Sequence, residues 1–436
     1  MLTRLELDGF KTFRNFALDF QPFMVFIGPN GVGKTNLFDA ITLLARLAEG
    51  DSLEEAMSHA RGEPAELFTL HADGTRAERM QIAAELLLER ESLGANGKPF
   101  APTNTRLRYE LTLERRGEGA HIVAESLLPL QESRDSWVKD HIPTKARKAW
   151  IVREKRPPYI ATVGEEGELS IYRNQDTLAG GREGLKVGDL RKSALGTADP
   201  IRYPTIHAVR QAMRNWRLLR FNPEVLRQPC AATAEAKLQP DGANLPAVIA
   251  RLLRDQSEAI ADITAALQGM LPHVKAIEVK TLSNGSRQLI ELVAQDGTRF
   301  SSRVLSDGTL RLLGLAALRY DATHHGVICY EEPENGIQLL RLADMVNVLF
   351  GLALNLEREV PDGTQMPPLR QALINTHSPS ILSNVPRQSV YYFGLRTDER
   401  GQHTYAVEVR PELIPDEQER YRTWLQIQQE LSGSAQ

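Results

Sequence analysis

The stretch GPNGVGKT, from Gly28 to Thr35, constrains the fold of this chain more than any other feature. It fits the spacing G-x-x-x-x-G-K-[ST], in which glycines let successive backbone N–H groups turn toward phosphate oxygens. The apolar run FMVFIG precedes the loop, and apolar residues at helical spacing follow it. The sequence therefore predicts a buried strand, a phosphate-binding loop, and a helix whose N-terminus points at the anion.

The loop gives its side chains separate tasks. By the chemistry of the motif, Lys34 reaches the β- and γ-phosphates of a nucleotide, and the Thr35 hydroxyl ligates Mg²⁺. ATP and Mg²⁺ are therefore the expected ligands. The residues expected to bind the nucleotide here are Gly28, Asn30, Gly31, Gly33, Lys34, Thr35 and Asn36.

A second apolar run, in GVICYEEPENG from Gly326 to Gly336, ends in two carboxylates. Buried strands do not normally end this way without a cation or a reaction nearby. In P-loop ATPases the first carboxylate of such a pair holds Mg²⁺, often through water, and the second polarises the attacking water. We therefore expect Glu331 to be a metal ligand and Glu332 the general base. The alternative is a solvated acidic loop after a core strand.

These motifs resemble the ABC, RecF and SMC branch of P-loop ATPases. Asn30 fits its G-x-N-G-x-G-K-[ST] loop, and Glu332 with Pro333 and Glu334 matches its D-E-P-E. Glu331 departs from the pattern because most relatives carry Asp there. A carboxylate that acts through a metal-bound water can absorb one extra methylene, so Mg²⁺ binding is expected to survive.

Two further motifs resemble the same branch. LSDGT is similar to the signature L-S-G-G-Q, with Ser306 and Gly308 matching and Asp307 departing. The resemblance implies a hydroxyl and a helix N-terminus aimed at a γ-phosphate. His377, at the end of the apolar run in LINTHSP, resembles the switch histidine that senses this phosphate. Glu332, His377 and Lys34 are the expected catalytic residues.

Two other features of these ATPases have a less clear counterpart in this sequence. The opening segment LTRLELDGFKTF resembles the start of SMC and RecF-type proteins, where it lies near the nucleotide. Lys11 and Phe13 are therefore either nucleotide contacts or ordinary residues at a strand end. The glutamine loop has no clear counterpart, and Gln81 is the nearest candidate.

The patterns along the chain predict an α/β fold: an ABC/SMC-type P-loop nucleotide-binding domain with a mixed sheet and an antiparallel β portion, plus a helical and irregular insertion. The expected division is 1–130 for the first part of the ATPase core, 131–275 for the insertion, and 276–436 for the part with the signature, the acidic pair and the switch histidine. Residues 131–200 have no predicted regular structure. The last 25 residues are expected to form an amphipathic helix.

Composition narrows the class of protein. With 42% apolar and 25% charged residues in 436, the chain has the balance of a soluble globular protein. The net charge of −4 means that any nucleic-acid binding must come from a local patch. The charged N-terminal segment does not resemble a signal peptide, and no apolar run reaches about 18 residues. We therefore expect a cytoplasmic protein that does not enter a membrane.

The resemblance also implies an assembly. In the ABC branch the signature serine completes the site of a neighbouring subunit, so we expect a homodimer closed by ATP, or a larger assembly of such dimers. The chain resembles RecF-like ATPases of anti-phage defence and toxin–antitoxin systems, which control a separate effector such as a Toprim-like nuclease. The alternatives are a RecF- or SMC-like ATPase of DNA repair or chromosome maintenance, and an ABC transporter subunit, which the long insertion disfavours.

Two basic segments make DNA a further candidate partner. The segment from Arg134 to Arg156 holds eight Lys/Arg against three acids, and RQAMRNWRLLR is expected to place several arginines on one helical stripe. Interleaved aromatic rings could stack on bases while the cations contact phosphates. The alternatives are a solvated basic face or an ion-paired subunit contact. The residues involved are Arg210, Arg214, Arg217, Arg220, Trp137, Trp150 and Trp216.

Overall fold

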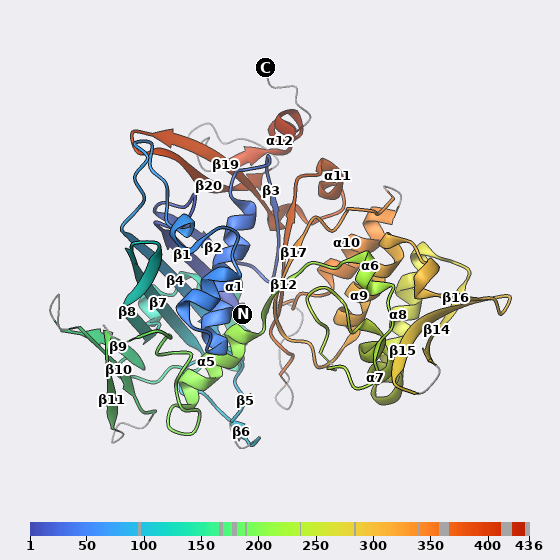
Figure 1. The fold of residues 1–436 in the computed structure, drawn as a ribbon, viewed down its shortest axis with the longest axis horizontal. Coiled ribbons are helices and arrows are strands. Elements are labelled where there is room, and N and C mark those ends of the chain that lie inside the picture. The colour runs from blue at the N-terminus through green and yellow to red at the C-terminus, as the bar shows by residue number, and fades with distance from the viewer. Residues whose placement is uncertain are drawn as a thin grey trace.

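Two large sheets and a helical lobe make up the protein (Figure 1). The computed structural model describes residues 1–94, 97–164, 169–176, 181–187, 190–235, 237–282, 285–338, 341–356, 366–410 and 421–431. Helices α1 (Lys34–Glu49) and α5 (Pro204–Arg214) pack between the two sheets. The α/β fold with a mixed sheet and an antiparallel portion is confirmed.

The central sheet carries the P-loop. Its order is β12 (Trp216–Leu219), β17 (Gly326–Glu331), β18 (Arg370–Thr376), β3 (Phe23–Ile27), β19 (Val390–Asp398), β20 (Gly401–Arg410) and β21 (Tyr421–Thr423). The strands from β12 to β19 are parallel, and β20 is antiparallel to β19. β3, β17 and β18 are buried along almost their whole length, as continuous apolar runs between two covered faces must be.

The second sheet is antiparallel throughout. Its order is β11 (Arg182–Lys186), β10 (Ser170–Asn174), β9 (Ile160–Val163), β8 (Gly119–Pro129), β7 (Arg106–Arg116), β4 (Arg79–Leu87), β1 (Leu2–Asp8) and β2 (Phe16–Asp19). In β1, buried and exposed residues alternate because one face of this sheet is solvated. A short hairpin of β5 (Ser92–Leu93) and β6 (Pro99–Phe100) lies apart from it.

The stretch 131–200 is more regular than the sequence predicts. It contains α3 (Ser136–His141) and α4 (Thr144–Trp150), and β9, β10 and β11 then extend the antiparallel sheet. These strands are short, and β10 and β11 are largely polar, so their pairing with β8 and with one another defines them more than an apolar pattern does. Later in the expected insertion, β12 joins the central sheet.

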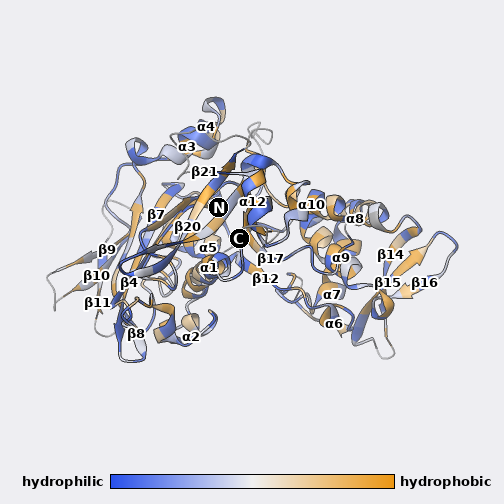
Figure 2. Cartoon of the chain, turned by 90° about the horizontal axis from the view of Figure 1, so that it is seen from above, coloured by the Kyte–Doolittle hydropathy of each residue, from blue (hydrophilic) through white to orange (hydrophobic). Residues whose placement is uncertain are grey.

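The helical lobe lies beside the sheets and is joined to them through β12 and β17, as the view from above shows (Figure 2). A small sheet of β13 (Cys230–Ala231), β15 (Arg287–Ala294), β14 (Val274–Thr281) and β16 (Arg299–Ser301) forms its outer side. The helices of the lobe are α6 (Pro223–Leu226), α7 (Leu245–Asp255), α8 (Ser257–Met270), α9 (Asp307–Tyr320) and α10 (Leu342–Phe350). Their apolar faces form one cluster with the adjoining face of the central sheet.

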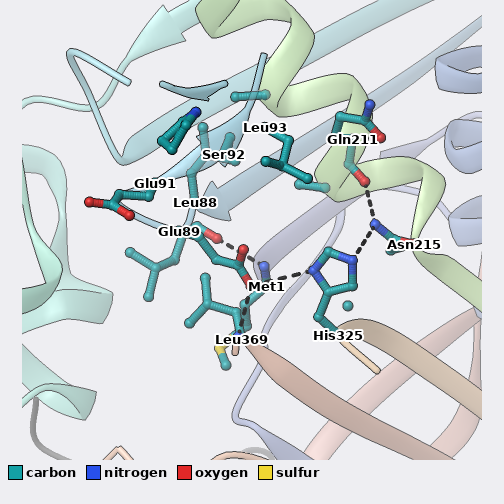
Figure 3. Close-up of a pocket in the computed structure, with 15 residues that line it drawn as sticks. Met1, Leu88, Glu89, Glu91, Ser92, Leu93, Gln211, Asn215, His325 and Leu369 are labelled. Carbon is teal, nitrogen blue, oxygen red and sulfur yellow. Dashed lines mark hydrogen bonds and ion pairs between the residues drawn. The ribbon is translucent and has the colours of Figure 1, made fainter. Parts of the chain in front are cut away.

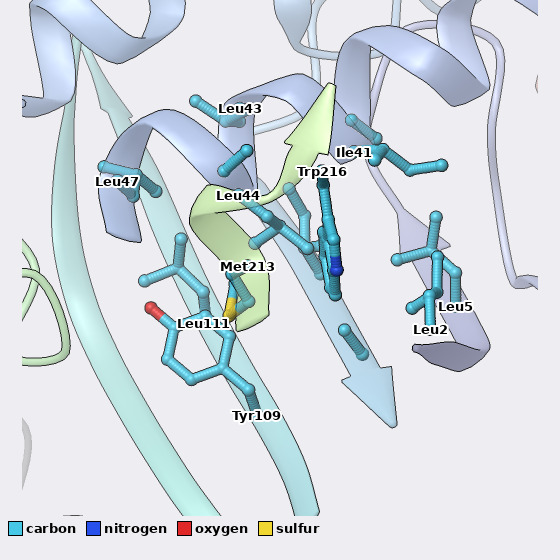
Figure 4. Close-up of a cluster of buried hydrophobic side chains, with 14 of the residues drawn as sticks. Leu2, Leu5, Ile41, Leu43, Leu44, Leu47, Tyr109, Leu111, Met213 and Trp216 are labelled. Carbon is cyan, nitrogen blue, oxygen red and sulfur yellow. The ribbon is translucent and has the colours of Figure 1, made fainter. Parts of the chain in front are cut away.

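A second apolar cluster fills the space between the two large sheets. Figure 4 shows side chains of β1, α1, β7, α5 and β12 meeting there. The labelled members are Leu2, Leu5, Ile41, Leu43, Leu44, Leu47, Tyr109, Leu111, Met213 and Trp216. Because α1 follows the P-loop directly, this packing fixes the direction in which the loop presents its N–H groups.

Three short helices complete the described chain: α2 (Leu53–Ser58), α11 (Pro379–Leu382) and α12 (Trp424–Leu431). The expected amphipathic helix over the last 25 residues is shorter here, because the strand β21 precedes it and Thr423 accepts a hydrogen bond from the Gln426 N–H at its start. Residues 411–420 and 432–436, which that expectation also covered, lie outside the described residues.

A buried ion pair joins the basic segment to the antiparallel sheet. The guanidinium of Arg106 on β7 donates to both carboxylate oxygens of Asp135 at 2.9 Å, and neither side chain is exposed. Arg106 also donates to the Thr3 hydroxyl at 2.7 Å, and Arg153 pairs with Asp135 from the other side. Asp135 and Arg153 of this basic segment are therefore engaged within the fold.

We predict that Arg106→Ala destabilises the protein by about 3–5 kcal/mol, because it leaves the Asp135 carboxylate buried without its main partner. The measurement is urea unfolding followed by circular dichroism. Arg116→Ala is the matched control, since Arg116 ends the same strand and makes an exposed pair with Glu114. Equal shifts of the urea midpoint in both variants would contradict the assigned role of the buried pair.

Candidate functional site

The P-loop lies between β3 and α1, as the motif predicts. Gly31 and Gly33 have φ values of 81° and 100°, in the left-handed region that favours glycine. A Cβ on Gly33 would lie 2.3 Å from Thr404 Oγ1 and 2.6 Å from Thr12 Oγ1. The third glycine is therefore required both by its backbone conformation and by the close approach of β20 and of the turn after β1.

The ammonium of Lys34 is folded back onto the loop. Lys34 Nζ donates to the carbonyl oxygens of Gly28 at 2.6 Å and Pro29 at 2.8 Å. Burial lowers the pKa of Lys34 to about 8, although the carboxylates of Glu332 and Glu334 act in the opposite direction. The cation thus lies in a partly desolvated position with phosphate-binding geometry around it.

The other predicted loop residues differ in what they contact. Asn30 and Gly31 are exposed at the tip of the loop, and Gly28 is buried against the backbone of Phe393. The Asn36 side chain donates to the Thr12 hydroxyl at 3.1 Å and so ties α1 to the turn after β1.

Glu332 lies directly after β17 in a constrained conformation. Its φ is 45°, which is rare for a residue other than glycine and which Lys11 and Asn15, in the turn after β1, share. Its Oε1 lies 3.0 Å from His377 Nδ1, and its Oε2 accepts from Asn335 Nδ2 at 2.7 Å. The structure therefore brings the expected base and the expected switch histidine into contact.

Glu334 forms the buried side of this acidic group. Its Oε1 accepts a hydrogen bond from the Thr376 hydroxyl, and its Oε2 finds no hydrogen-bond partner among the residues that the structure describes. Burial raises the pKa of Glu334. Glu334 is thus the carboxylate of this loop that is least suited to carry a charge.

Glu331 is held by two arginines. Arg61 Nη2 lies 3.0 Å from both oxygens of its carboxylate, and Arg220 Nε lies 3.5 Å from Oε2. Arg61 comes from the segment after α2, and Arg220 follows β12. Neither arginine was expected at this site from the sequence.

One cavity of about 350 Å³ collects these groups. Thr35 of the P-loop, both carboxylates of the acidic pair and Asn375 of β18 line it together. Asn375 Nδ2 donates to Thr35 Oγ1 at 3.3 Å, while its buried Oδ1 meets no donor within the described part of the chain. Hydroxyl, carboxylate and amide oxygens are the ligands that Mg²⁺ takes in proteins, so the donor set fits this ion.

The signature residues lie outside that cavity. Ser306 caps the N-terminus of α9 by accepting from the Thr309 N–H at 3.2 Å, and Gly308 packs so closely that a Cβ would lie 2.8 Å from the Gly336 carbonyl oxygen. Asp307, which departs from the signature pattern, pairs with Arg227 at 2.5 Å. Its charge is therefore directed away from a phosphate at the helix end.

Comparisons with known proteins agree with this geometry. Residues 205–383 match the family described as "AAA domain, putative AbiEii toxin, Type IV TA system", and residues 1–98 match the one described as "AAA ATPase domain". Two proteins named "DNA replication and repair protein RecF" are similar to this chain. The one from Acidothermus cellulolyticus is 36% identical over 22% of this chain and 26% of its own length. The one from a Synechococcus species is 29% identical over 41% of this chain and 44% of its own length. The matched part thus spans less than half of either relative.

The fold comparison covers almost the whole chain. The crystal structure of an SMC head bound to the C-terminal winged-helix domain of ScpA superposes over 93% of this chain and 97% of that chain, with a TM-score of 0.50 and 10% sequence identity. At this identity the likeness concerns the fold. The family models and the RecF relatives support an ABC/RecF-like P-loop ATPase, and the fold is that of an SMC head.

The structure shows where three residues lie whose roles the sequence left open. Phe13 is fully buried in the core beside Phe16, so it presents no surface to a nucleotide. Lys11 pairs with the buried Asp39 at 2.6 Å. Gln81 lies exposed on β4, in the antiparallel sheet, and lines a different cavity.

The segment that the sequence analysis missed is the exit from β12. Arg220 and Phe221 line the nucleotide cavity at the point where the chain passes from the central sheet into the helical lobe. The signal was a strand that ends at Leu219 and is followed by Arg220 and Phe221, directly before Asn222, which caps α6. Asn375, two residues before His377, was already inside a quoted motif. Arg61 has no comparable sequence signal.

The expected DNA-contacting stripe is wrong in its details. Arg214 ends α5 whereas Arg217 is on β12, so the arginines do not share one helix. Arg210 donates to backbone carbonyls of Ala48 and Ala198. The three tryptophans of the basic segments are buried, at 3% exposure or less, and cannot stack on bases: Trp137, Trp150 and Trp216.

We predict that ATP binding takes up a proton at alkaline pH. Lys34 has a lowered pKa of about 8 without nucleotide, and a bound phosphate anion raises this pKa. The uptake equals the fraction of Lys34 that is deprotonated before ATP binds, which is about 0.2 per site at pH 7.5 and about 0.9 at pH 9. Calorimetric titration of ATP in buffers with different ionisation enthalpies measures this uptake.

Lys34→Arg is the control, because a guanidinium does not titrate in this range. Any ATP binding that this variant retains should lack the pH-dependent uptake. In the wild type, an uptake that stays constant between pH 7.5 and pH 9 would contradict the described environment of Lys34.

Proposed function

We propose that this protein binds ATP with Mg²⁺, hydrolyses it, and uses the closure of two copies around ATP to control a separate effector. The observation that carries the hydrolytic part is the position of Glu332. Its carboxylate is held by His377 and Asn335, and the same cavity contains Thr35 of the P-loop. A carboxylate fixed in this way is suited to accept the proton of an attacking water.

The other residues of the chain bind and orient the substrate. Lys34 leaves its two carbonyl partners and pairs with the β- and γ-phosphates, and the N–H groups of Gly31 and Gly33 contribute donors around them. His377 holds Glu332 by donating from Nδ1 to the carboxylate, so its Nε2 can donate to a γ-phosphate oxygen only when the ring is an imidazolium. Binding and orientation supply most of the catalysis in this type of reaction.

Thr35 and Glu331 are the residues that would hold Mg²⁺, which neutralises charge on the β- and γ-phosphate oxygens when bound. For this role Glu331 has to exchange its contacts with Arg61 and Arg220. The two guanidiniums are then free to face the nucleotide from the cavity wall that they already line. The longer Glu331 side chain is thus accommodated by a site that contains its own counter-charges.

The position of Ser306 supports a homodimer or a larger assembly of dimers. It lies at the N-terminus of α9, apart from the nucleotide cavity of its own chain. A second copy that presents Ser306 and the α9 N-terminus would complete the site of the first, since a helix N-terminus binds phosphate oxygens. The assembly would act as a switch, because the γ-phosphate would hold the two copies together and hydrolysis would let them separate.

The family description naming an AbiEii toxin and a toxin–antitoxin system supports anti-phage defence as the setting, with a separate effector such as a Toprim-like nuclease. DNA repair or recombination is the second candidate, and the similarity to RecF proteins favours it. DNA remains a candidate partner through exposed lysines of α3 and α4, Lys139, Lys145 and Lys148. We place this activity in the cytoplasm.

A transporter subunit would need a membrane partner, and none of the described helices has the length and apolar character to cross a bilayer by itself. The long insertion still disfavours this alternative. The two leading candidates differ in whether DNA is needed. DNA-stimulated ATP hydrolysis by the purified chain would favour the repair role, and stimulation by a co-encoded protein would favour effector control.

We predict that Glu332→Gln converts the protein into a stable ATP-bound dimer. The amide keeps the size and shape of the Glu332 side chain but cannot accept the proton, so the closed state persists. Size-exclusion chromatography with light scattering, with and without ATP and Mg²⁺, measures the mass of the particle.

The control is Ser306→Arg in the Glu332→Gln background, which places a bulky cation at the contact while the P-loop stays intact. This double variant should bind ATP and remain monomeric. A Glu332→Gln protein that binds ATP as a monomer, or a double variant that dimerises equally well, would contradict the proposed arrangement.

A further inference from the structure

A second polar cavity lies at the edge of the central sheet opposite to the P-loop. Its volume is about 290 Å³, and it opens where β12 and β17 begin. We call it the basal cavity. Its lining residues are Arg217, Lys237, Leu238, Arg251, Leu318, Asp321, Thr323, His324 and His325.

Positive charge dominates this cavity. Asp321 is its single lining carboxylate in the described chain, and it is already neutralised: Arg251 pairs with it, and Thr323 donates to its Oδ1 from the backbone N–H at 2.9 Å and from the hydroxyl at 2.7 Å. Beneath the cavity, Arg370 donates to the carbonyl oxygens of Asp321 and His324. In the described chain Arg217 and Lys237 line or border the cavity without a direct ion pair, although Asp321 and Glu235 lie near enough to act on their charges.

His324 lines the cavity, but its unused donor is buried behind the cavity surface. The residue is only 4% exposed. Its Nδ1 lies 3.1 Å from Arg217 Nη2. Burial, together with the neighbouring cations, lowers the pKa of His324 and keeps the ring neutral. Because Nδ1 accepts from the guanidinium, the proton is on Nε2, which has no partner in the described ranges.

Arg217 and Lys237 add further donors. Arg217 Nη1 donates to the Leu238 carbonyl at 2.8 Å, but its buried Nε–H has no acceptor among the described residues. Lys237 lies at the exposed mouth, with Nζ 2.6 Å from Asn215 Oδ1. Burial of the ammonium, and then its proximity to Arg217, lower the pKa of Lys237 to about 8. An anion in the cavity would relieve the repulsion between the Arg217 and Lys237 cations.

We propose that Arg217, Lys237 and His324 form a second anion site that takes a phosphate group, either free phosphate or the phosphate of a mononucleotide. The cavity lies at the low end of the range of about 300–1,000 Å³ usual for ligand pockets, so a small anion fits it and a polynucleotide does not. Guanidinium, ammonium and imidazole N–H groups make charge-assisted hydrogen bonds to phosphate oxygens.

The neighbouring cavity provides a contrast. It has about 430 Å³ and lies on the other side of His325 and Asn215 (Figure 3). Its polar groups satisfy one another: His325 Nδ1 faces Glu89 Oε1 at 3.5 Å, and Asn215 Nδ2 donates to the Gln211 carbonyl at 2.8 Å. Glu89 and Glu91 also make it unsuited to an anion. The unused donors are thus specific to the basal cavity.

The basal cavity shares two strands with the nucleotide site. Arg217 is on β12, which ends directly before Arg220, and His324 precedes β17, which ends in Glu331. Arg220 and Glu331 contact each other at the nucleotide cavity. A phosphate bound in the basal cavity would therefore rest against the beginnings of the same strands whose ends hold the expected metal ligand.

The test is isothermal titration calorimetry of the full chain with sodium phosphate in a chloride buffer at pH 7.5, repeated with AMP. The wild type and Lys34→Ala should both show one saturable site, because the basal cavity does not include the P-loop. Lys237→Met should weaken binding by about tenfold or more, since it removes a charged donor at an exposed position. Lys237→Arg, which keeps the charge, and Lys275→Met, an exposed lysine elsewhere, should bind as the wild type does.

Binding of free phosphate would assign the site to the inorganic anion, and binding of AMP alone would assign it to a nucleotide. Absence of saturable binding of both ligands to the wild type would overturn the proposal. Binding that is lost in Lys34→Ala and kept in Lys237→Met would also overturn it, because the ligand would then occupy the P-loop. Circular dichroism of Lys237→Met confirms that a weakened signal comes from a folded protein.

Discussion

The hydrogen bonds of β18 with its two parallel neighbours are the constraint on which the rest of the structure depends. Asn375 is in register with Glu331 on one side and with Phe26 on the other, and Thr376 is in register with Ile27, the last residue of β3. Parallel strands end at the same edge of a sheet, so this register places the P-loop, the acidic pair and His377 side by side. A slip of one residue would separate them and turn buried side chains outward.

The charged side chains of the site are balanced by other groups of the protein. Glu331 is held by Arg61 and Arg220, and Lys34 is held by backbone carbonyls near Glu332 and Glu334. In each of these contacts, a group that is expected to bind nucleotide or metal is paired with another group of the protein. Under the proposed function, substrate binding would therefore exchange one set of polar contacts for another, and little of the site would have to be built anew. Such pre-organisation is what a reaction governed by positioning and electrostatics requires.

The sequence was sufficient for the parts of the site in which a motif follows an apolar run. The P-loop, the Glu331–Glu332 pair and His377 all lie at the ends of buried strands, where strand pattern and motif agree. Contacts between distant segments could not be predicted in this way: Arg61 and Glu331 are 270 residues apart in the chain, and packing alone brings them together. The burial of the tryptophans of the basic segments depends on long-range packing as well, because an aromatic residue among cations looks the same in a sequence whether it is exposed or buried. Likewise, β9 to β11 are too short and polar to be recognised without their partners.

The central claim is that Glu332 is the base of a working ATPase in spite of the glutamate in place of aspartate at 331. The most direct measurement is the steady-state rate of Mg²⁺-dependent phosphate release from ATP by the purified chain, beside Glu332→Gln. A positioned base accelerates a reaction by about 10²–10⁴-fold. The variant should therefore turn over at least about 100-fold more slowly than the wild type, with ATP binding retained. Equal rates in the two proteins would show that Glu332 is not the base, and failure of the wild type to bind ATP would contradict the account as a whole.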